Sequence, residues 1–116
     1  MDEVSMRKFA TFTLVVIATA CSKSPQDQQT DKIRTQAHEQ AEAITRHADQ
    51  QAKPLEQQAE ALRAEAKKTG GYGGKRLEIQ ADASSKQAKL LHEQADEQAD
   101  AVKEAADAQI KAIRSR

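Results

Sequence analysis

The stretch "TGGYGG" at 69–74 contains all four glycines of this 116-residue chain. Glycine adopts backbone conformations with positive φ at little cost, so a cluster of glycines can end a helix and reverse the chain. The flanking residues are mostly Ala, Gln, Glu, Lys and Arg, which are strong helix formers. The sequence therefore predicts two long helices, about 27–68 and 75–114, joined by a glycine-rich turn at 69–74.

An 11-residue repeat runs through both predicted helices. Each copy begins with a large aliphatic residue and has an alanine four residues later. The copies are "IRTQAHEQAEA" (33–43), "ITRHADQQAKP" (44–54), "LEQQAEALRAE" (55–65), "LHEQADEQADA" (91–101) and "VKEAADAQIKA" (102–112). Such a repeat has about 3.67 residues per turn and keeps one face aligned along a nearly straight helix. We expect an all-α fold at 30–116, an antiparallel two-helix hairpin with hendecad repeats in the manner of a coiled coil.

Folding the chain about the middle of the turn gives ten facing pairs, and six of them set a bulky aliphatic against an alanine, as close helix packing needs. Residues equidistant from that point face each other: Ile33 and Ile110, Ala37 and Ala106, Ala41 and Val102, Ile44 and Ala99, Ala48 and Ala95, Ala52 and Leu91, Leu55 and Ala88, Ala59 and Ser84, Leu62 and Ala81, and Ala66 and Leu77. Pro54 lies inside the first helix, where it predicts a kink or a break. Because an alanine methyl contributes only about 0.8 kcal/mol when buried, we also expect self-association or a partner to bury more surface.

The segment "MRKFATFTLVVIATAC" at 6–21 has the composition of a signal peptide. A short basic region, Arg7 and Lys8, precedes an uncharged run at 9–19. That run is too short for a helix that spans a bilayer, which takes about 20 residues, but it has the length of a signal-peptide core. Small residues then lead to Cys21, the only cysteine. The sequence predicts a signal peptide at 1–20, with Met6 as the natural start.

This segment resembles the signal of bacterial lipoproteins, whose lipobox ends in a cysteine that becomes the lipidated N-terminus. The resemblance implies palmitate and related acyl chains on Cys21, with Ala18 where the family prefers Leu. Ser22 is not the Asp that retains such proteins in the inner membrane, which implies an outer-membrane lipoprotein facing the periplasm. The alternatives are an ordinary secretory signal with a free cysteine, or a buried N-terminal helix.

The start of the mature chain allows two interpretations. Residues 21–29 are predicted to be a flexible tether between lipid and helix. Within them, one possible helix start has its N-cap at Ser24 and its first-turn proline at Pro25. Asp27 then follows as an acid that suits the helix dipole. The alternative start is nearer Thr30 and Asp31.

The overall plan, a lipidated cysteine followed by an Ala-rich helical rod, resembles the small structural lipoproteins of the murein lipoprotein kind by composition. Members of that family are heptad rods that join peptidoglycan through a C-terminal lysine. This chain has an 11-residue repeat, a glycine turn and Arg116 at its end. The resemblance therefore does not imply that this chain is covalently attached to the cell wall.

The residue types needed for catalysis are not arranged for it. His38, His47 and His92 share no i, i+3 or i+4 spacing, so no metal site is predicted. In the folded register His47 is expected near Asp96, and His92 near Gln51. No serine is adjacent to a histidine, and the glycine stretch lacks the Lys-Ser/Thr of a phosphate-binding loop. We expect no enzyme activity, no cofactor apart from the lipid, and no small-molecule substrate.

The residues around the turn form the best candidate for an interaction surface. Lys67, Lys68, Lys75 and Arg76 surround Tyr72, and we expect this interaction tip to contact an acidic surface such as cell-wall carboxylates or a partner protein. The alternative reading is that Lys67 and Lys68 compensate the helix dipole and that all four cations aid solubility. The formal net charge of zero argues against nucleic acid as a partner.

We therefore expect a non-enzymatic structural or protein-interaction element, anchored to the membrane of the bacterial envelope by its lipid. It is expected to contact itself, an envelope protein or peptidoglycan. Two alternatives remain: a stress- or chaperone-like protein built from helical 11-residue repeats, and a small accessory subunit of an envelope complex.

Overall fold

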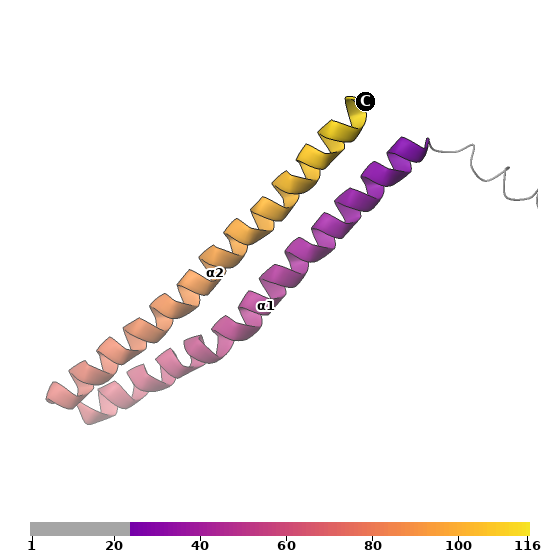
Figure 1. The fold of residues 1–116 in the computed structure, drawn as a ribbon. Helices are drawn as coiled ribbons and strands as arrows, with labels where there is room; N and C mark the ends of the chain where they lie inside the picture. The colour runs from indigo at the N-terminus through magenta and orange to yellow at the C-terminus, as the bar shows by residue number, and fades with distance from the viewer. Residues whose placement is uncertain (1–23) are drawn as a thin grey trace, which may run out of the picture.

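A computed structural model describes residues 24–116, and the predicted signal peptide and Cys21 lie outside the described residues. Two α-helices make up almost all of this region: α1 at Pro25–Thr69 and α2 at Gly71–Arg114. They lie side by side and antiparallel, so the C-terminus returns to the level of the start of α1 (Figure 1). The predicted all-α helical hairpin is confirmed.

The start of α1 follows the first of the two predicted alternatives. Ser24 has an extended backbone, and its Oγ accepts a hydrogen bond from the backbone N–H of Asp27 at 3.2 Å. Pro25 opens the helix, where its missing N–H costs no hydrogen bond. A start near Thr30 and Asp31 is wrong, and residues 25–29 belong to α1 rather than to the predicted tether. The cap at Ser24 and the proline at Pro25 are therefore sufficient to start α1 at Pro25.

The turn is shorter than predicted. Only Gly70 separates the two helices, whereas a turn over 69–74 was expected. Gly70 and Gly71 have φ of 64° and 58°, in the left-handed region that favours glycine. The N–H of Gly70 donates to the carbonyl of Ala66 at 2.9 Å and closes α1. Two glycines reverse the chain, so Gly73 and Gly74 are already part of α2.

Gly74 serves a different purpose from the glycines at the reversal. It is buried, and a Cβ built on it would lie 2.7 Å from the carbonyl oxygen of Ala66. No real side chain tolerates that distance, so the two backbones approach each other at the closed end as only glycine allows. This close contact sets the separation at which the helices leave the turn.

Alanines occupy the innermost positions between the helices. The buried residues of α1 and α2 are Thr30, Ala37, Ala41, Ala48, Ala52, Ala59, Ala66, Gly74, Ala81, Ala88, Ala95, Ala99, Ala106 and Ile110. The large aliphatics that the sequence also placed on this face are mostly half-buried and flank the alanines, among them Ile44, Leu55 and Leu91. Small side chains let the helices come close, and the larger ones then cover the edges of the contact.

The repeat changes along the hairpin. Towards the open end, buried and half-buried residues of α1 are spaced by three, four and four residues, as the 11-residue repeat predicts. From Ala52 to the turn the spacing alternates between three and four, which is a heptad pattern. The two periods favour opposite supercoil hands. α1 bends in its middle part while α2 runs straighter beside it (Figure 1).

The bend also has a local cause. Pro54 lies inside α1, and the helix continues through it without a break. Proline lacks the N–H of one helical hydrogen bond and its ring pushes away the preceding turn, which bends helices. Of the two outcomes left open by the sequence, a kink and a break, the structure has the kink.

Replacing Gly74 with alanine is expected to destabilise the protein by about 1–3 kcal/mol, because the added Cβ overpacks the contact with the Ala66 carbonyl. Gly73→Ala is the matched control. There the Cβ would meet only the exposed Thr69 side chain, at 3.0 Å, and alanine is the better helix former. Urea unfolding followed by circular dichroism measures both. Equal stability of the two variants would show that the helices do not meet this closely.

Pro54→Ala is expected to stabilise the protein, by up to about 3 kcal/mol, because it restores a helical hydrogen bond at an exposed position. Thermal unfolding of the wild type and the variant measures the difference. A lower melting temperature would mean that the bend is needed for the half of α1 nearest the turn to follow α2.

Candidate functional site

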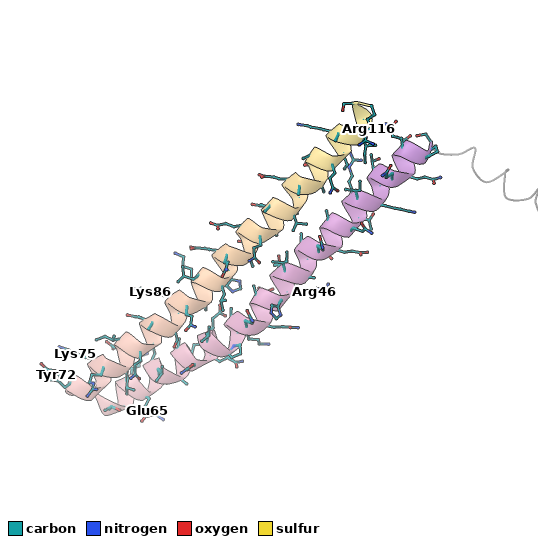
Figure 2. All side chains as sticks on the ribbon, in the orientation of Figure 1. Arg46, Glu65, Tyr72, Lys75, Lys86 and Arg116 are labelled. Carbon is teal, nitrogen blue, oxygen red and sulfur yellow. The ribbon has the colours of Figure 1, made fainter. Side chains whose placement is uncertain are left out.

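The predicted interaction tip lies together at the closed end of the hairpin. Tyr72 is 89% exposed and points away at this end (Figure 2). Lys67 and Lys68 lie in the last turn of α1, and Lys75 and Arg76 follow the first turn of α2. All four cations are exposed, and within residues 24–116 none of them forms an ion pair. Tyr72 belongs to the first helical turn of α2 rather than to a loop.

Backbone donors add to the positive character of the tip. Gly70 precedes α2 without any side-chain cap, and the first turn of α2 contains no acidic residue. The first N–H groups of a helix have no acceptor within it, and they form the positive end of the helix dipole. The start of α2 and the four cations therefore favour negative charge at this end, where Lys67 and Lys68 offset the negative dipole end of α1.

Along the body, one side of the hairpin is held by polar contacts between the helices. Arg63 of α1 donates from Nη2 to Ser85 Oγ at 2.9 Å and lies 3.4 Å from Asp82 Oδ1, both on α2. Near the open end, Gln26 Nε2 donates to the carbonyl of Ile113 at 2.5 Å. These contacts join residues at matching levels of the two helices and help to fix their register.

His92 makes a further link between the helices. Its Nδ1 lies 3.3 Å from Asp49 Oδ1 and its Nε2 lies 3.5 Å from Glu56 Oε1, so each ring nitrogen is close to a carboxylate of α1. A protonated imidazole can donate to both, and the neutral ring has one N–H and can donate to one. Among the described residues, no group of His, Cys, Asp and Glu is arranged to hold a metal ion.

The expected neighbour of His92 is wrong, and that of His47 stays a prediction. His92 was expected near Gln51, and His47 near Asp96, from their levels along the hairpin. Instead His47 and Gln51 line one groove between the helices together with Gln94, while His92 is on the other side with Asp49. Distance from the turn fixes the level of a residue but not the side of the interface on which it lies.

The two sides of the α1–α2 interface differ in chemistry. On one side, open grooves near the free ends are lined by alanines and by charged or titratable residues. We call this side the charged face, and its lining side chains are Arg34, His38, Glu42, Arg46, Lys103 and Asp107. Ala37 and Ala106 line grooves on both sides, which shows that the grooves lie back to back across the same interface.

The opposite side is lined mainly by amides. We call it the glutamine face, and its glutamines are Gln36, Gln40, Gln51, Gln94, Gln98 and Gln109. On α1 these glutamines and His47 recur with spacings of four and seven residues. On α2 the set Gln94, Gln98, Ala105 and Gln109 has the same spacings. The 11-residue repeat thus produces a second regular face besides the buried one.

Two exposed large hydrophobic residues of α2 were not anticipated. Ile79 and Leu90 are 68% and 62% exposed, and they are 11 residues apart on α2. Their 11-residue spacing is visible in the sequence, at a different position of the repeat from the buried residues. A second apolar position in the same repeat was the available signal.

Comparisons do not assign the chain to a family: no family model, curated protein or solved structure matches it. Within residues 24–116, neither helix contains a stretch long and apolar enough to cross a membrane. The functional argument therefore rests on the residues of this chain.

Replacing the four cations of the tip with glutamine is expected to leave the stability of the protein unchanged within about 0.5 kcal/mol per residue, because all four are exposed. The pair Lys67→Gln/Lys68→Gln should be the less stable, since only these two close a helix and suit its dipole. Chemical denaturation of this pair and of Lys75→Gln/Arg76→Gln tests the order. A clear loss of stability in the second pair would mean that those cations have a structural partner.

Proposed function

We propose that this protein is a non-enzymatic, lipid-anchored interaction element of the bacterial envelope, which presents a basic tip at the end of a helical hairpin. The anchor is Cys21, at the end of a segment that resembles a lipoprotein signal. The single observation that carries the proposal is the separation of the two functional ends. The anchor precedes the start of α1, and the tip lies at the far end of the same helix.

The length of α1 supports this separation of the anchor from the tip. Cys21 is four residues before Pro25, so a chain of that length keeps the lipid within about 14 Å of α1. α1 has 45 residues and therefore extends over about 65 Å. Contacts made by Tyr72 and its surrounding cations then occur far from the point of attachment. A protein of this shape joins one surface to another without enclosing a substrate.

An acidic partner suits the tip best. Four exposed cations and the unpaired amides at the start of α2 attract negative charge, and the aromatic ring of Tyr72 offers area at small entropic cost. The carboxylates of the cell wall and an acidic envelope protein both meet this description. The outer membrane, with the hairpin on its periplasmic side, is the proposed location.

The anchor is tested by labelling cells with radioactive palmitate. We expect label in the wild-type protein and none in Cys21→Ser, because the thiol is the proposed acylation site. Equal labelling of both proteins would contradict the anchor. Fractionation of the same cells should then place the wild type, and not the variant, in the outer membrane.

The tip is tested separately by photo-crosslinking in intact cells. A photoreactive phenylalanine analogue at position 72 is expected to crosslink to peptidoglycan or to an envelope protein. The same analogue at exposed Lys53, in the body of α1, is the control. Crosslinking should fall when the four cations are replaced with glutamine. Equal yields from the two positions would rule out the tip as the contact.

A further inference from the structure

The buried alanines are covered to different degrees along the hairpin. We call 51–92, which contains the turn, the closed half, and 25–50 together with 93–114 the open half. Four alanines of the closed half are 0% to 1% exposed: Ala52, Ala59, Ala81 and Ala88. The buried alanines of the open half are 4% to 7% exposed: Ala37, Ala41, Ala48, Ala95, Ala99 and Ala106. Ala66, also 4% exposed, faces Gly74, which has no side chain to cover it. Apart from that position at the turn, the closed half excludes water more completely.

The change of repeat accounts for this difference. On α1 of the closed half, the half-buried Leu55 and Leu62 lie between successive buried alanines. In the open half, alanines follow each other at a spacing of four with no half-buried residue between them: Ala37 and Ala41 on α1, Ala95 and Ala99 on α2. Grooves on both sides of the hairpin reach the interface here, between 33–51 of α1 and 91–109 of α2. The pairing of the open half therefore gains less from burial.

Pro54 places an interruption at the level where the cover changes. In a regular helix the N–H of residue 54 bonds to the carbonyl of residue 50, and proline has no N–H. The missing bond of α1 therefore lies between Ala48 and Ala52, where the exposed fraction of the buried alanines falls from 6% to 0%. α1 bends in its middle part while α2 runs straighter (Figure 1). A loss of helix in one half is thus transmitted less strongly to the other.

The polar contacts between the helices divide at the same level. Those of Arg63 lie within the closed half. His92 lies at the division, close to Asp49 on one side of Pro54 and to Glu56 on the other. Separating the open half breaks the contact with Asp49 and the exposed hydrogen bond near the free ends, and leaves the rest in place. Exposed contacts of this kind contribute little, so they hold the open half only weakly.

We propose that the open half separates as a unit while the closed half stays paired, with the division at 48–54. The separated segments of α1 and α2 lose most of their helix, because helices in proteins depend on packing for their stability. The closed half keeps the contact of Gly74 with Ala66 and so keeps the tip assembled. This opening is independent of the proposed anchor and partner, because it follows from the interface of the hairpin alone.

Native-state hydrogen exchange of the full-length wild-type chain measures the opening. Mass spectrometry of peptic fragments is used, under conditions in which closing is faster than exchange. After correction for intrinsic rates, we expect amides at 33–48 and 95–109 to exchange more than about 10-fold faster than those at 55–66 and 77–88. The profile along α1 should have a step at 48–54, because each half opens as a unit.

Three results of this measurement would overturn the proposal. Equal protection in the two halves would show a single cooperative unit. Protection that declines smoothly from the turn to the free ends would show the ordinary fraying of helix ends. A step that lies outside 48–54 would overturn the division at Pro54.

Two glycine substitutions at buried alanines of α1 distinguish two units from one. Each replaces the best helix former, so exchange that requires unfolding of the substituted site should become at least about fivefold faster. Ala59→Gly lies in the closed half, which stays paired when the open half separates. It is therefore expected to speed exchange in the closed half and to leave the open half unchanged.

Ala41→Gly is the matched variant in the open half. It is expected to speed exchange in both halves by a similar factor, because the closed half exchanges through complete unfolding, which includes residue 41. Faster exchange of the open half in Ala59→Gly, equal to that in Ala41→Gly, would show that the hairpin unfolds as one unit and would overturn the proposal. An open half unaffected by Ala41→Gly would also overturn it, since that half would then exchange without separating at this site.

Discussion

The close approach of α1 and α2 is the constraint on which the rest of the structure depends. At the closed end the helices are so near that only Gly74 fits beside the carbonyl of Ala66. Farther along, the buried positions are almost all alanine, which keeps the separation small over the whole length. Apart from Ile110, the large residues lie outside the centre of the contact and cover its edges. The hairpin is therefore narrow, and much of the surface of each helix remains exposed.

A narrow hairpin with an alanine interface has little burial to stabilise it. Each alanine methyl contributes only about 0.8 kcal/mol. Polar contacts on one side, such as those of Arg63 and His92, set the register but are partly exposed and contribute modestly. Ile79 and Leu90 do not add to this burial, because both lie exposed on α2.

The arrangement also separates two ends along one chain. The start of α1 adjoins the proposed lipid anchor, and the closed end carries Tyr72 with its cations. Between them, an 11-residue repeat keeps the buried, charged and glutamine sets of residues each on a fixed side over many turns. A strict heptad on a straight helix would move those sets gradually around the axis. The heptad spacing nearest the turn covers too short a distance for that drift to mix them.

The sequence by itself determined the two helices, their antiparallel pairing, the cap at Ser24 and the alanines of the interface. These features follow from local propensity and from the spacing of apolar residues, which act without knowledge of the rest of the fold. Only the tertiary structure decided that two glycines suffice for the reversal and that Gly74 is needed for packing. It also decided that His92 meets Asp49 rather than Gln51. The reason is that distance from the turn gives the level of a residue, whereas the side it occupies depends on how closely the helices pack and how they rotate about their axes.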